Sequence, residues 1–152
     1  MIGKTVPSFF GPNDASDLAE DARRLLAELD REVPGVAALN SECRPSLDVF
    51  ETTTGVEVVV DVPGVIPESI RVAIKRDTLL VVGAKAAPAG ATAQRYHLAE
   101  RSYGRFARAV RLNGAIDTRH ATARAANGEL RIVLPHLEDR RGVVMMVPVD
   151  TA

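Results

Sequence analysis

The spacing of apolar residues changes at about residue 45, and this change limits the possible folds more than any other feature of the chain. Ahead of it apolar residues recur every three or four positions, and after it they recur at every second position up to about residue 135. Val56, Val58, Val60 and Val62 form one such run. Side chains two residues apart lie on the same face of a β-strand. The second pattern therefore predicts half-buried strands over most of the chain.

Turn signals divide this stretch into short segments. Asn127-Gly128 favours a hairpin because both residues tolerate a positive φ, and residues 87–92 have the composition of a loop. Residues 79–82 are apolar at every position, which indicates a strand buried on both faces. About seven or eight short strands separated by turns are typical of a sandwich. We expect residues 45–135 to form an all-β, immunoglobulin-like antiparallel β-sandwich.

Residues 1–44 form a separate N-terminal arm in this interpretation. Apolar residues recur there at helical spacing, at Ala15, Leu18, Ala22, Leu25 and Leu29. The spacing predicts an amphipathic helix over about 14–32, with Asn13 as its cap and Pro34-Gly35 as its end. Two interpretations stay open: the helix packs on its own domain, or it is an arm that docks elsewhere.

Residues 136–152 form a C-terminal extension, in which a charged linker precedes an apolar tail. Val147 and Val149 project to the same side of an extended segment, and Pro148 restricts the backbone between them. Such a pair suits an apolar groove at the edge of a sheet. The alternative is a final strand that folds back onto its own domain.

The sequence gives little support for catalysis. Its three histidines lack metal-ligand spacing, and there is no glycine-rich phosphate loop. We therefore expect no enzyme activity, no metal site and no cofactor. A catalytic sandwich would need a convergent polar pocket, for example His97, Ser102 and Asp117 in one cleft. Cys43 has no recognisable partner histidine.

Charge and hydropathy exclude other classes of partner. The formal net charge is −1, which argues against nucleic acid or anionic lipid as the main partner. A membrane span would need about 18 consecutive apolar residues, and the sequence has no such run. The N-terminal stretch lacks a signal-peptide core, and one cysteine forms no disulfide within a chain. We expect a cytoplasmic protein.

Arg108 lies on the apolar face of an expected strand, with Phe106 and Val110. A charge in such a place is costly unless it is paired. We therefore expect a carboxylate partner for Arg108, with Glu100 and Asp117 as candidates, from the same chain or from another one.

Ala123-x-x-x-Asn127-Gly128-x-Leu130 resembles the signature of the small heat shock proteins, which are chaperones built on an α-crystallin domain. Other segments resemble the family in the same order: PSLDVFET, GVEVVVDVPGV, ESIRVAI, DTLLVVGAK and ER-x-x-G-x-F-x-R. The resemblance covers about residues 45–135, and the valine pair of the tail resembles the family's I-x-I/V anchor. Two departures are Glu129, where the family usually has an apolar residue, and Leu112-Asn113, where Leu-Pro is common.

The resemblance implies an ATP-independent holdase, which binds unfolding client proteins, and homodimers that assemble into larger oligomers. The anchor would be Val147, Pro148 and Val149, docking in an edge groove lined by Ile70, Val72, Ile74, Leu130, Ile132 and Leu134. Residues 94–101 look like the swapped segment of the bacterial and plant form.

The dimer interface would then include Tyr96, His97, Leu98, Glu100, Arg101 and Arg108. Client contacts are expected from apolar residues of the arm, namely Val6, Phe9, Phe10, Leu18, Leu25 and Leu29. A p23/CS-type co-chaperone, or a dedicated interaction module, remains the alternative, and a monomer would favour p23/CS.

Overall fold

The computed structural model describes residues 12–33, 43–90, 93–137, 144 and 146–149. Three of the expected client contacts, Val6, Phe9 and Phe10, lie outside this part of the chain, as does the side chain of Leu18.

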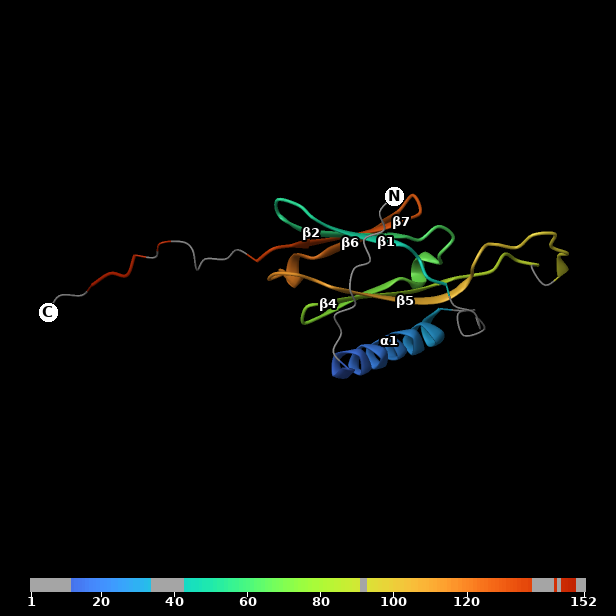
Figure 1. Cartoon of the computed structure of the whole chain (residues 1–152), viewed down its shortest axis with the longest axis horizontal. Coiled ribbons are helices and arrows are strands. Elements are labelled where there is room, and N and C mark those ends of the chain that lie inside the picture. Colours follow the sequence, from blue (N-terminus) through green and yellow to red (C-terminus); the bar gives the residue numbers. More distant parts are fainter. Residues whose placement is uncertain (1–11, 34–42, 91–92, 138–143, 145, 150–152) are drawn as a thin grey trace.

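The described strands form two antiparallel sheets that pack face to face (Figure 1). The first sheet has the order β1 (Leu47–Glu51), β2 (Gly55–Asp61), β7 (Glu129–Pro135), β6 (Thr122–Ala126). The second has the order β3 (Arg71–Lys75), β4 (Thr78–Lys85), β5 (Gly104–Arg111). The 3-10 turns η1 (Pro67–Ser69) and η3 (Thr118–His120) lie between strands. The predicted all-β, immunoglobulin-like antiparallel sandwich is confirmed.

The core lies between the sheets and follows the two-residue period. In the β2–β7 pair Val58 lies opposite Ile132, and Val60 lies opposite Leu130. These four side chains are 0–2% exposed. Burial of each such side chain contributes about 1.5–3 kcal/mol to folding. The period therefore determines which face of each central strand becomes core.

Gly55 begins β2 where the backbone of β7 approaches closely. A Cβ atom at this position would lie 2.2 Å from the carbonyl oxygen of Leu134. That oxygen belongs to the partner strand of the β2–β7 ladder, in which Val56 lies opposite Leu134, so it cannot move without disturbing the pairing. Only glycine fits here without displacement of backbone.

We predict that Gly55→Ala lowers the free energy of unfolding by about 1–3 kcal/mol, because the added methyl overpacks a site bounded by backbone. Urea denaturation followed by circular dichroism measures the loss. Thr53→Ala is the control, since Thr53 is exposed in the same turn and its change should stay within about 0.5 kcal/mol. Equal unfolding midpoints for the two variants would contradict the prediction.

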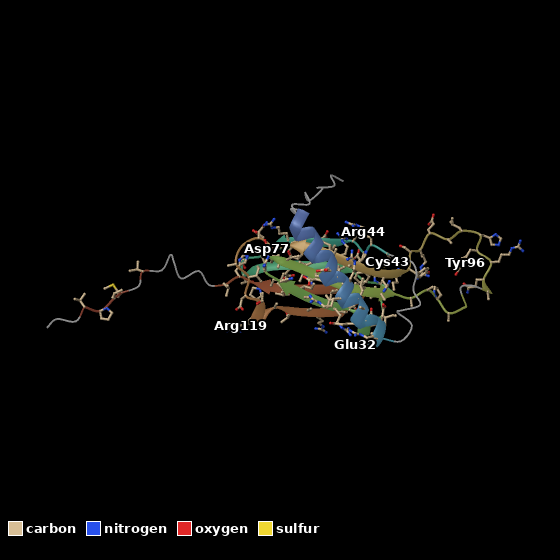
Figure 2. All side chains as sticks on the ribbon, turned by 90° about the horizontal axis from the view of Figure 1, so that it is seen from below. Glu32, Cys43, Arg44, Asp77, Tyr96 and Arg119 are labelled. Carbon is tan, nitrogen blue, oxygen red and sulfur yellow. The ribbon has the colours of Figure 1, made fainter. Side chains whose placement is uncertain are left out.

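Helix α1 (Pro12–Glu32) lies across the outer face of the second sheet (Figure 2). Leu29 is fully buried and Val33 is 8% exposed, against side chains of β4. Of the two open interpretations, the structure therefore shows the helix packed on its own domain. Leu25 and Leu29 were expected to contact clients, but both pack on the sheet, because the apolar stripe of α1 faces an apolar sheet surface.

Candidate functional site

A groove of about 350 Å³ lies where the two sheets meet along one side of the sandwich. Its two rims are edge strands, β3 of the second sheet and β6 of the first. The lining residues are mostly apolar or small: Val72, Ile74, Thr118, Ala121, Thr122, Ala123 and Ile132. The groove thus combines apolar side chains with two strands that each have one partner.

The predicted groove is corrected in part. Val72, Ile74 and Ile132 line it and also contact the main core, whereas Ile70 contacts that core without lining the groove. Leu130 and Leu134 are 2% and 0% exposed and belong to that core. The reason is the strand order: β6 lies outside β7, so β6 forms the rim.

The β6 side of the groove was not predicted from the sequence. Ala123 lies opposite Ile132 in the β6–β7 pair, and both residues line the groove. Ala123 belongs to the family signature, which does not by itself predict a place in the groove. Alanine and threonine at successive positions of an edge strand were the available signal, since small side chains leave room for a ligand.

η3 forms one end of the groove wall and is held by Asp117. The Asp117 carboxylate accepts a hydrogen bond from the backbone N–H of Arg119 at 3.1 Å and contacts Nδ1 of His120 at 2.5 Å. The hydrogen bond with His120 lowers the pKa of the Asp117 carboxyl, and the backbone N–H groups of Arg119 and His120 lower it further. These contacts therefore favour the ionised form of Asp117.

We predict that His120→Ala raises the pKa of Asp117 toward the ordinary aspartate range, because the largest cause of its lowering is removed. A carboxyl with a lowered pKa in the folded state stabilises it above the ordinary pKa, and this contribution is lost as the pH falls through the lowered value. Carbonyl ¹³C NMR of Asp117 during an acid titration measures the shift. His136→Ala is the control, and an unchanged Asp117 titration in His120→Ala would contradict the prediction.

The tail lies away from the sandwich (Figure 1). Val147 and Val149 are 79% and 84% exposed, and the backbone from Val147 to Val149 is not paired with any described strand. A final strand folded back on its own domain is therefore not seen for residues 144 and 146–149. Both valines are therefore exposed to solvent.

A second extended segment leaves the sandwich between β4 and β5 (Figure 1). It carries Tyr96, which Figure 2 shows within this segment and which is 52% exposed, and Leu98, which is 74% exposed. At its base the ring of Tyr103 stacks with Arg101 and Lys85, whose cationic groups lie 5.2 and 5.6 Å from the ring centre. We call residues 93–103 the exposed arm.

β1 is the other unpaired edge of the first sheet. Val49 and Phe50 on this strand are 42% and 41% exposed. An extended segment from another molecule can add to such an edge through backbone hydrogen bonds.

Arg108 is half-buried on β5, as its place among apolar residues predicted, but its partner differs from the expected one. Its guanidinium donates to the backbone carbonyl of Pro45. Burial, followed by the nearby Arg44, lowers the pKa of Arg108. No ion pair joins Arg108 to a carboxylate in the described part of the chain: Glu100 lies in the exposed arm, and Asp117 contacts His120. Among the described residues the carbonyl of Pro45, in the segment before β1, takes the place of the expected carboxylate. A carboxylate partner from another chain stays a prediction.

The residues that a catalytic sandwich would need are not gathered. His97 and Ser102 lie in the exposed arm, whereas Asp117 lies beside η3 near the opposite end of the sandwich (Figure 1). Over the described ranges, no group of His, Cys, Asp and Glu residues has a metal-binding arrangement. Burial raises the pKa of the Cys43 thiol, which donates to the carbonyl of Gly104 at 3.4 Å. No helix among the described residues is long and apolar enough to cross a membrane.

The order of motifs, the two sheets and the edge groove agree with one protein family. The family model for the Hsp20/alpha crystallin family matches residues 48–149. The chain belongs to this family. The expected resemblance to the small heat shock proteins is thus confirmed, and it favours them over the p23/CS alternative.

Similar Hsp20 proteins come from distant organisms. The chain is 32% identical to an 18.9 kDa heat shock protein of Oryza sativa over 130 residues, which covers 85% of this chain and 73% of that protein. It is 31% identical to heat shock protein 16 of Schizosaccharomyces pombe over 133 residues, which covers 86% of this chain and 89% of that protein.

Solved Hsp20 structures share the fold. Heat shock protein 16.0 from Schizosaccharomyces pombe superposes with a TM-score of 0.59 at 27% identity, over 72% of this chain and all of that one. The hspA protein from Xanthomonas axonopodis gives a TM-score of 0.59 at 28% identity, over 63% of this chain and 96% of that one. Relatives named as heat shock proteins support a chaperone role.

Proposed function

We propose that the protein is an ATP-independent holdase, which assembles through its tail and binds unfolding proteins before they aggregate. The observation that carries the proposal is the presence, in one chain, of an apolar edge groove and an exposed Val147-Pro148-Val149 segment. The two features are complementary, because the exposed valines of a tail would be buried against the apolar walls of a groove.

Spacing supports the docking of the tail in the groove. Alternate side chains of an extended segment are about 6.6–6.8 Å apart. Val147 and Val149 have this spacing in the tail, and Val72 and Ile74 have the same spacing along β3. A tail laid along β3 would therefore place each valine against one apolar residue of the rim. Because the described tail residues lie far from their own groove, a neighbouring subunit is the favoured acceptor (Figure 1).

The exposed arm and the β1 edge supply the proposed dimer contact. Leu98 of the arm is largely exposed, and Tyr96 of the arm and Val49 and Phe50 of β1 are each about half exposed. Addition of one subunit's arm to β1 of its partner would pair the backbone of both and cover these side chains. Two different contacts, the arm on β1 and the tail in the groove, would then link dimers into larger assemblies.

Client binding follows from mass action. A protein that binds unfolded chains lowers the concentration of the species that aggregates, without an energy source. Val6, Phe9, Phe10 and Leu18 remain proposed contacts, and Leu25 and Leu29 join them only when α1 leaves the sheet. We place this activity in the cytoplasm.

Light scattering of a heat-labile enzyme at its unfolding temperature tests the proposal. We expect near-equimolar protein, without ATP, to suppress the scattering, whereas an inert globular protein at the same concentration leaves it unchanged. Unaltered scattering across a full titration would overturn the holdase proposal and favour a dedicated interaction module.

A further inference from the structure

The outer face of β4 is apolar, which is unusual for one layer of a sandwich. Antiparallel sheets generally carry polar residues on the face that turns away from the core. Leu79 and Val81 of β4 belong to the main core. Leu80, Val82 and Ala84 point to the other side, where they are 5%, 0% and 0% exposed against α1. The sheet therefore has a second apolar surface, which α1 covers together with Val33 and Ile66 among the described residues.

Cations border this surface on both sides. Arg71 and Lys75 lie on β3, and Arg105 lies on β5. Each meets a carboxylate of α1 in an ion pair: Arg71 with Glu32 at 2.7 Å, Lys75 with Asp21 at 3.0 Å, and Arg105 with Asp30 at 3.1 Å. An apolar strip with two cations on one side and one on the other is complementary to a helix with an apolar stripe between carboxylates.

The contact between α1 and the sheet is small enough to exchange. The described part of the helix places Leu29 fully within it, with Ala22, Leu25 and Leu26 only partly covered. The bordering side chains are partly open to solvent, with Arg71 31% and Lys75 60% exposed. Ion pairs of this kind contribute little to stability. A competing helix at sufficient concentration would therefore displace α1.

We propose that the outer face of the β3–β4–β5 sheet is a docking surface for acidic amphipathic helices of unfolding clients, which α1 covers until a client displaces it. The inference rests on the proposed holdase function and assigns a substrate class to one of its surfaces. Recognition depends on an apolar stripe with flanking carboxylates rather than on a particular sequence, so many clients qualify. The surface is distinct from the edge groove, which takes an extended segment.

Two fluorescein-labelled peptides and the full-length protein test the proposal by fluorescence anisotropy. The acidic peptide has the sequence of residues 12–33, and the basic peptide has lysine in place of Asp21, Asp30 and Glu32. In a full-length variant with Asp21→Lys, Asp30→Lys and Glu32→Lys, the helix is repelled from the sheet. We expect this variant to bind the acidic peptide at least about tenfold more tightly than the unsubstituted protein does.

Charge reversal on the sheet supplies the reciprocal test. Arg71→Glu, Lys75→Glu and Arg105→Glu together should abolish binding of the acidic peptide and allow binding of the basic one. Arg124→Glu is the matched control, because Arg124 is an exposed cation on β6 of the other sheet and its reversal should leave both affinities within about twofold. Thermal unfolding by circular dichroism shows that each variant is folded.

Equal affinities for both peptides, or no tightening when α1 is repelled, would overturn the proposal. The proposal would also be overturned if the protein did not bind the acidic peptide and if labelled copies of the full-length protein showed energy transfer to one another. The surface would then be assigned to α1 of a second subunit. The light-scattering assay distinguishes failure of this proposal from failure of the holdase proposal. If the sheet variant loses the peptide but still suppresses aggregation, only this surface is wrong; if the unsubstituted protein fails to suppress it, the holdase proposal is wrong.

Discussion

Substitution of Val147 and Val149 by aspartate is expected to dissociate every assembly larger than the dimer. Burial of each valine in an apolar groove contributes about 1.5–3 kcal/mol to the free energy of docking, so loss of the pair removes about 3–6 kcal/mol per docked tail. Because about 1.4 kcal/mol corresponds to a factor of ten, the tail should bind more than about a hundredfold more weakly. The carboxylates add a desolvation cost on top of this loss. Analytical ultracentrifugation of the full chain measures the change in mass.

The same tail offers a matched control. Val144 is 85% exposed, as the anchor valines are, but it lies outside the pair, so Val144→Asp should leave the mass unchanged. Ala123→Phe fills the groove from the opposite side and should release the tail as the aspartates do. A mass identical to that of the unsubstituted protein in both the tail and the groove variants would contradict tail docking.

Leu134→Ala is expected to lower the free energy of unfolding by about 2–5 kcal/mol, because it leaves a cavity between the sheets. Leu134 is fully buried and lies opposite Val56 on the two inner strands of the first sheet. Since domains of this size are stable by about 5–15 kcal/mol, a large part of the total would be lost. Urea denaturation with circular dichroism detection gives the value directly.

Leu137→Ala provides the comparison, with the same change of side chain three residues further along. Leu137 is 51% exposed, so its truncation should alter the free energy of unfolding by no more than about 0.5 kcal/mol. A similar loss in both variants would show that the effect of Leu134→Ala does not come from core packing.

The strands could be predicted because the pattern that forms them is local. Alternation at Val58 and Val60, or at Leu130 and Ile132, says which side of a strand is apolar, and the structure places these side chains in the core. The run 79–82 even indicated that β4 needed cover on both faces. What covers the second face depends on tertiary packing, so the sequence left the position of α1 open.

The groove and the environment of Arg108 could be predicted only in part, because both depend on strand order. Nothing in the alternation around Ile132 shows that β6 will lie outside β7 and form the rim. Arg108 was expected to be buried, but the carbonyl of Pro45 comes from a segment 63 residues earlier in the chain. Long-range contacts of this kind follow from the fold rather than from spacing.

The pairing of β2 with β7 also has a consequence for how the chain is made. The two strands form the middle of the first sheet, yet the Arg131–Glu57 ion pair across them joins residues 74 positions apart. At about 5–20 residues per second, a ribosome exposes β2 roughly 4–15 s before β7 exists. During that interval Val56, Val58 and Val60 have no partner strand on that side. A nascent chain stalled before Glu129 is therefore expected to be sensitive to protease, because the apolar residues of β2 are then exposed.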